Sequence, residues 1–150
     1  CFAPESLAEY ERRRAQFQAR RDYFIPALQQ LGLHVPVMPD GAFYAWADSR
    51  EAARRLGVAD SWELAFALME RAHLAVTPGR DFGTHAPGQY LRFSTANAME
   101  QLKEAVARLR RLLGSSTALA HPPRPWRLRF QSACTGKTPM PVASCSTPIT

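Results

Sequence analysis

The side chain with the clearest chemical potential in this 150-residue chain is Arg92, which follows a glycine-rich loop at 78–89. Residues 90–96 alternate as a strand does, which places the arginine among apolar and aromatic neighbours. A guanidinium cannot lose its proton, and a partly buried charge is costly unless it has a counter-ion. Its planar fork fits a carboxylate or a phosphate through two hydrogen bonds. Arg92 is therefore a candidate anion-binding residue.

A structural ion pair is the alternative for this arginine. Asp81 or Asp48 could supply the anion, and Arg92 would then serve the fold rather than a ligand. The residues by themselves leave both alternatives open. Metal binding has no comparable support, because the four histidines share no ligand spacing and the three cysteines have no zinc spacing. We predict no metal site.

Charge and hydropathy disfavour two classes of partner. The formal net charge is +6, but residues 1–114 hold all 13 acidic and 15 of the 19 basic residues, so this part is nearly neutral. A nucleic-acid module built on Arg12, Arg13, Arg14 and the C-terminal tail is therefore disfavoured, and we predict no nucleic-acid partner. No apolar run approaches the ~20 residues of a membrane helix. We predict a cytoplasmic protein without membrane association.

Four helices are predicted from apolar periodicity and from capping residues. Residues 5–31 carry one apolar stripe, and Pro26 is expected to kink or split this helix. Shorter helices are expected at 50–56, from 60 to about 72, and from 97 to 113. The residues expected to cap or end the four helices are Gly32, Ser49, Gly57, Asp60 with Glu63, Asn97 with Glu100, and Gly114.

The segments between these helices predict a small sheet. Asp40-Gly41 is a turn signal between residues 35–38 and 42–46, which favours a hairpin. Residues 73–76 and 90–96 are two further strand candidates. The fold class is therefore α+β, a small antiparallel or mixed sheet with helices packed on one face. We expect one domain at 1–114 and a basic, proline-rich tail at 115–150 that is disordered or frameshifted.

Five motifs in order resemble one known family. They are R-R-D-Y at 20–23, P-D-G-A-F-Y-A-W at 39–46, A-V-T-P-G-R-D-F-G at 75–83, Y-L-R-F-S-T-A at 90–96 and E-Q-L-K-E-A-V-A-R-L at 100–109. Each motif is weak alone, but their order and spacing are specific. The stretch from about Tyr10 to Leu113 resembles the C-terminal small domain of fold-type I, class I/II aminotransferases that depend on pyridoxal 5'-phosphate.

The resemblance implies a function for several residues. In such proteins the arginine of the Y-x-R-x-S strand binds the substrate α-carboxylate, which is Arg92 here. Gly41 would let backbone approach the substrate, while Phe43 and Tyr44 are candidates to line the pocket, with core packing the alternative for at least one of them. The implied reaction transfers an amino group between an amino acid and a 2-oxo acid in a homodimeric enzyme.

The resemblance also implies that the cofactor-binding groups lie outside this sequence. The only lysines are Lys103 and Lys137, and neither has the context of the family's Schiff-base lysine. We therefore expect no catalytic and no cofactor-binding residue in this chain, and no transamination by the chain alone. Two alternatives stay open: another fold-type I enzyme, such as a lyase, decarboxylase or acyl-transferring synthase, and the ligand-sensing domain of a transcription regulator.

Overall fold

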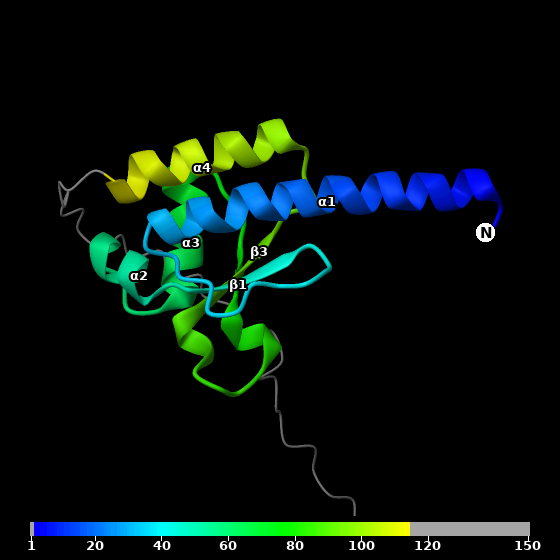
Figure 1. Ribbon diagram of the computed structural model, residues 1–150. Coiled ribbons are helices and arrows are strands. Elements are labelled where there is room, and N and C mark those ends of the chain that lie inside the picture. Colours follow the sequence, from blue (N-terminus) through cyan, green and yellow to red (C-terminus); the bar gives the residue numbers. More distant parts are fainter. Residues whose placement is uncertain (1, 115–150) are drawn as a thin grey trace, which may run out of the picture. The chain divides into compact units, whose positions relative to one another are not determined.

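The computed structural model describes residues 2–114, and the predicted tail at 115–150 lies outside the described residues. The elements follow in the order α1 (Pro4–Gln30), β1 (Tyr44–Asp48), α2 (Arg50–Leu56), α3 (Ser61–Ala72), β2 (Thr77–Pro78), η1 (Gly79–Phe82), η2 (Pro87–Gln89), β3 (Tyr90–Ser94) and α4 (Met99–Gly114). The two η elements are short 3-10 turns. Figure 1 shows α1 and α4 side by side, with β1 and β3 crossing beneath them. No helix between residues 2 and 114 is long and apolar enough to span a membrane.

The three strands form one antiparallel sheet in the order β1-β3-β2. The central strand, β3, pairs along its whole length with β1, so that Trp46 lies opposite Arg92 and Ala47 opposite Leu91. On its other side, β2 places Thr77 opposite Arg92. The predicted α+β class with a small antiparallel sheet is confirmed.

The predicted hairpin between residues 35–38 and 42–46 is wrong. The only contact of this kind in the described chain is an isolated antiparallel bridge between His34 and Asp48. Pro36 and Pro39 have no N–H group, so this segment cannot donate the bonds of a regular ladder. Strand β1 instead takes β3 as its partner.

One face of the sheet carries the apolar core. Leu91 is fully buried and Phe93 is 4% exposed, and both point toward the helices, as the predicted alternation requires. They pack with a cluster that draws on α1, α2, α3 and α4. None of these four helices packs on the opposite face of the sheet, which carries Arg92. The expectation that the helices pack on one face is confirmed.

Helix α1 is buried over only part of its length. Phe24 and Leu28 are buried in the core, whereas Leu7 is 47% and Tyr10 is 54% exposed. In Figure 1 the N-terminal part of α1 projects beyond the other described elements. The apolar stripe of α1 therefore extends toward the N-terminus beyond the residues that pack against other described elements. The helix runs through Pro26 without splitting, so of the two predicted effects of this proline the split does not occur.

The helix ends and the strand expected at 73–76 follow the sequence signals with three exceptions. Asp60 caps α3 by accepting the N–H of Glu63 at 2.9 Å, and Gly57 ends α2 in the left-handed conformation, with φ +68°. Ser49 precedes α2, but its hydroxyl donates to the Gln89 carbonyl instead of capping the helix.

The other two exceptions concern the start of α4 and the strand predicted at 73–76. At α4 the Ala98 N–H donates to the Gln101 side chain, so the cap lies one residue later than Asn97 with Glu100. The strand begins only at Thr77, because His73 adopts φ +53° and closes the end of α3.

Candidate functional site

Arg92 lies at the centre of the sheet face that the core helices do not cover. Its neighbours on that face come from all three strands, since Trp46 and Thr77 lie opposite it in the registers of β1 and β2. The guanidinium donates one long hydrogen bond, 3.5 Å, to the Thr77 hydroxyl. That distance is at the outer limit for a hydrogen bond, so it satisfies little of the group's capacity of five donors.

Neither carboxylate considered from the sequence pairs with Arg92. Asp48 binds Arg50, with 2.5 Å between Oδ2 and Nη2, and the hydrogen bonds from Arg50 lower the pKa of Asp48 below its usual value. Asp81 is exposed and forms no ion pair with Arg92. Within residues 2–114, Arg92 therefore has no carboxylate partner.

Two aromatic rings take the place of a counter-ion. The guanidinium carbon of Arg92 lies 4.2 Å from the centre of the Tyr44 ring and 4.1 Å from the centre of the Phe82 ring. Tyr44 comes from β1 on the sheet, and Phe82 comes from the end of η1. A cation at such a distance from a ring face is stabilised by the ring quadrupole.

The two residues considered as pocket lining, Phe43 and Tyr44, play different parts. Only Tyr44 contacts Arg92; the Phe43 ring lies 4.4 Å from Tyr44 and 5.9 Å from Phe17 of α1, centre to centre. Their exposed fractions are 36% and 41%, so neither belongs to the core. The sequence does not predict the contact between the Phe82 ring and the Arg92 guanidinium, because the contact depends on how η1 folds back over the sheet.

Gly41 lies in an open turn near these rings. A Cβ atom built on it would meet nothing within 4 Å, and the left-handed residue of the turn is Ala42, with φ +59°. The turn is attached to α1 by Arg21, whose Nη1 donates to the carbonyls of Pro39 at 3.0 Å and Asp40 at 3.3 Å. Arg21 is thus a scaffold residue that connects α1 to this turn.

The arginines considered for a nucleic-acid module, Arg12, Arg13 and Arg14, form exposed ion pairs within α1. Arg12 and Arg13 both bind Glu9, and Arg14 binds Glu11. The hydrogen bonds from Arg12 and Arg13 lower the pKa of Glu9 to about 2. These guanidiniums are therefore largely neutralised by neighbours on their own helix.

The loop beside Arg92 depends on a close approach at Gly79. A Cβ atom on this residue would lie 2.5 Å from the Pro87 carbonyl oxygen and 2.8 Å from the Tyr90 carbonyl oxygen. Both contacts are with backbone, which cannot move aside as a flexible side chain does. Only glycine lets η1 pack against η2 and the start of β3, and this packing carries Phe82 to its place over Arg92.

We expect Gly79→Ala to lower the free energy of unfolding by about 1–3 kcal/mol, the usual range for overpacking. Gly88→Ala is the matched control, because its added Cβ would meet only Asp60 Cβ, at an ordinary 3.7 Å. Urea unfolding of both variants, followed by circular dichroism, measures the difference. Equal stability of the two variants would contradict the close approach.

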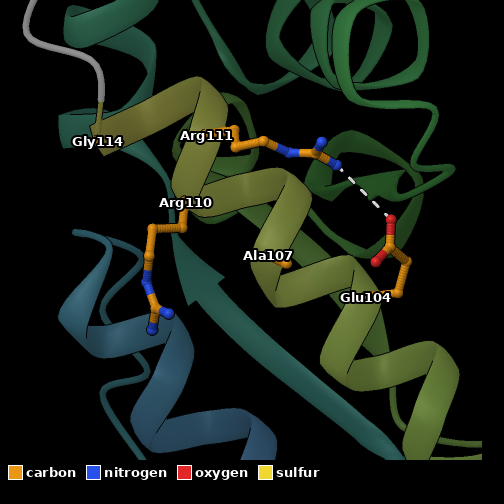
Figure 2. Close-up of a pocket in the computed structure, with 5 residues that line it drawn as sticks. All are labelled: Glu104, Ala107, Arg110, Arg111 and Gly114. Carbon is orange, nitrogen blue, oxygen red and sulfur yellow. Dashed lines mark ion pairs between the residues drawn. The ribbon is translucent and has the colours of Figure 1, made fainter.

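A surface hollow on α4 does not compete with this face as a site. One hollow is lined by Glu104, Ala107, Arg110, Arg111 and Gly114, all on α4. Figure 2 shows Arg110 and Arg111 pointing to different sides of the helix, with Arg111 paired to Glu104 at 3.6 Å. Side chains that diverge in this way do not converge on a ligand. Between residues 2 and 114 there is also no cluster of three or more potential metal ligands.

The comparison with known proteins decides the family. The sequence model described as "Aminotransferase class I and II" matches residues 2–109. The chain belongs to this family. Its members are, in general, enzymes that depend on pyridoxal 5'-phosphate and transfer amino groups between amino acids and 2-oxo acids.

Individual aminotransferases match over the same region. The putative aminotransferase YugH of Bacillus subtilis (strain 168) is 33% identical over 111 residues, covering 74% of this chain and 27% of that protein. The aspartate aminotransferase of Bacillus sp. (strain YM-2) is 37% identical over 103 residues, covering 69% and 26%. The chain therefore spans about a quarter of the length of these curated relatives.

Solved aminotransferase structures share the fold. An aromatic aminotransferase from Pyrococcus horikoshii OT3 superposes with a TM-score of 0.66 at 32% identity, covering 74% of this chain and 28% of that one. A mutant of the Thermus thermophilus aspartate aminotransferase superposes with a TM-score of 0.62 at 36% identity, covering 72% and 26%. The resemblance inferred from the five motifs is confirmed.

The residues present do not fit the family's cofactor. Lys103 is the only lysine between residues 2 and 114, and it is exposed on α4. That helix packs on the core face of the sheet, opposite the face that carries Arg92. A lysine so placed lies away from Arg92 and does not fit the role of a lysine that joins the cofactor to a substrate held there.

Proposed function

We propose that residues 2–114 are the substrate-carboxylate-binding part of an aminotransferase that moves an amino group between an amino acid and a 2-oxo acid. The observation that carries the proposal is the state of Arg92. Its guanidinium is partly buried on the open face of the sheet, is stabilised by two rings and is not paired with a carboxylate of the described chain. Such a group retains its capacity for a bidentate hydrogen-bonded ligand.

Arg92 would act by binding and orienting the substrate. Two parallel N–H···O bonds fix both the position and the plane of a carboxylate, and fixing a reactant in this way is worth several kcal/mol of the barrier. The cofactor supplies the electron sink in this family. Its binding groups and the lysine would come from outside residues 2–114.

Two finer assignments belong to the same proposal. Gly41 would allow backbone to lie close to the substrate, and the open space at its Cβ position leaves room for such an approach. The active enzyme would be a homodimer. The relatives described above are named as aminotransferases, which favours transamination over the lyase and decarboxylase alternatives.

We expect the 150-residue chain by itself not to transaminate. Mixed with pyridoxal 5'-phosphate, an amino acid and a 2-oxo acid, it should produce no new 2-oxo acid above the background of free cofactor. The protein expressed from its complete reading frame should produce it under the same conditions, and a coupled dehydrogenase assay measures both. Turnover by the isolated chain would contradict the absence of a cofactor site, whereas no turnover by the complete protein would contradict the proposed function.

A further inference from the structure

The two rings at Arg92 stabilise its charge in a way that a carboxylate would not. A carboxylate partner would occupy the N–H groups at the edge of the guanidinium. An aromatic ring attracts the cation through the negative face of the ring and offers no carboxylate oxygen, so it does not occupy those N–H groups as a carboxylate would. Tyr44 and Phe82 therefore make a partly buried arginine tolerable without using the groups that a ligand would need.

Both rings are themselves held by further aromatic contacts. Phe82 meets Trp46 edge to face, with centres 5.9 Å apart and an interplanar angle of 88°. Trp46 in turn stacks on Tyr90, with centres 5.4 Å apart and an angle of 16°. On the other side, Tyr44 is supported by Phe43. The rings that contact the guanidinium are thus fixed by their neighbours, although each is partly exposed.

We infer that Tyr44 and Phe82 are positioning residues, which hold the Arg92 guanidinium in the orientation that presents its N–H groups to the substrate carboxylate. The inference rests on the proposed function, in which that carboxylate is the ligand. Removing either ring gives the guanidinium more rotational freedom, and this freedom is lost again when a carboxylate binds. The affinity for the carboxylate therefore falls although the arginine remains.

The test is a titration of the full 150-residue chain, labelled with nitrogen-15, with pyruvate as the probe. The side-chain Nε–Hε signal of Arg92, assigned by its loss in Arg92→Leu, and the backbone amides of Thr77 and Phe93 report binding. Tyr44→Leu and Phe82→Leu should each weaken the apparent affinity about two- to fivefold. The aromatic exchanges Tyr44→Phe and Phe82→Tyr should restore it.

The control is Tyr10→Leu, which removes an aromatic ring at a 54% exposed position of α1 and should leave the affinity unchanged. A second measurement is the hydrogen exchange of the Arg92 Nε–H, which should become faster in the two leucine variants and return to its original rate in the aromatic ones.

The outcomes separate the inference from the proposed function. If Arg92→Leu abolishes pyruvate binding while both leucine variants bind as the unchanged chain does, the positioning role is overturned and the proposed function stands. If the leucine variants bind weakly but the aromatic exchanges fail to restore binding, the ring faces are not the cause and the positioning role is again overturned. If Arg92→Leu binds pyruvate normally, the carboxylate-binding role of Arg92 itself fails.

Discussion

Arg92→Leu should lower kcat/KM for amino acids by about 30- to 5,000-fold in the protein expressed from its complete reading frame. The range corresponds to about 2–5 kcal/mol, the usual cost of removing one partner of a hydrogen-bonded charge pair. Leucine replaces the apolar stem of the arginine but has no charge and donates no hydrogen bond. The substrate carboxylate would then lie in a partly desolvated position without a counter-ion.

Steady-state kinetics with an amino acid and a 2-oxo acid measure this loss. Cofactor absorbance should be unchanged, because Arg92 is not part of a cofactor site. Arg12→Leu is the matched control, since it makes the same replacement at an exposed arginine that, within residues 2–114, pairs with Glu9 on its own helix. Arg92→Lys should recover only part of the activity, because an ammonium keeps the charge but lacks the planar fork. Unchanged turnover in Arg92→Leu would mean that the arginine is structural.

Leu28→Ala should lower the free energy of unfolding of the 150-residue chain by about 2–5 kcal/mol. Leu28 is fully buried where α1 packs in the core. Removing three of its side-chain carbons loses apolar burial and also leaves a cavity that the neighbouring helices can fill only in part. Urea unfolding followed by far-ultraviolet circular dichroism measures the change.

Leu7→Ala is the matched control on the same helix. Leu7 is 47% exposed, so its truncation should change the stability of the chain by no more than about 0.5 kcal/mol. Ile25→Val, expected to cost about 0.5–1.5 kcal/mol at a 1% exposed position, keeps the comparison measurable if Leu28→Ala unfolds the chain. Equal losses in Leu7→Ala and Leu28→Ala would show that the first half of α1 is packed in solution.

The sequence alone was sufficient to predict those features that depend on neighbouring residues. The alternation at 90–96 placed Leu91 and Phe93 on one face and Arg92 on the other, because side chains in a strand alternate whatever its partner is. Gly57 and Asp60 marked helix ends for a similar reason, since caps are formed within a few residues. The residues of the five motifs, with their order and spacing, likewise carried the resemblance to the family, because each motif is a run of neighbouring residues.

The tertiary structure decided which segments become partners. Strand β1 pairs with β3 and not with the nearby segment that the turn signal favoured. In this pairing Trp46 lies opposite Arg92, which comes 46 positions later in the sequence. Local patterns cannot predict such a choice, because it depends on hydrogen-bonding groups that are distant in the sequence. In the same way, the stripe of α1 extends to Leu7, but burial begins only where other helices meet it.

The surroundings of Arg92 show most clearly which features the local sequence predicts and which depend on the fold. The need of a guanidinium for an anion followed from its chemistry alone, and left Asp48, Asp81 and a substrate as candidates. Only the fold showed that Asp48 binds Arg50, and that Tyr44 and Phe82 approach the cation from two different elements. Residue types determine which interactions a side chain requires, whereas the packing of distant segments determines which of its possible partners are within reach.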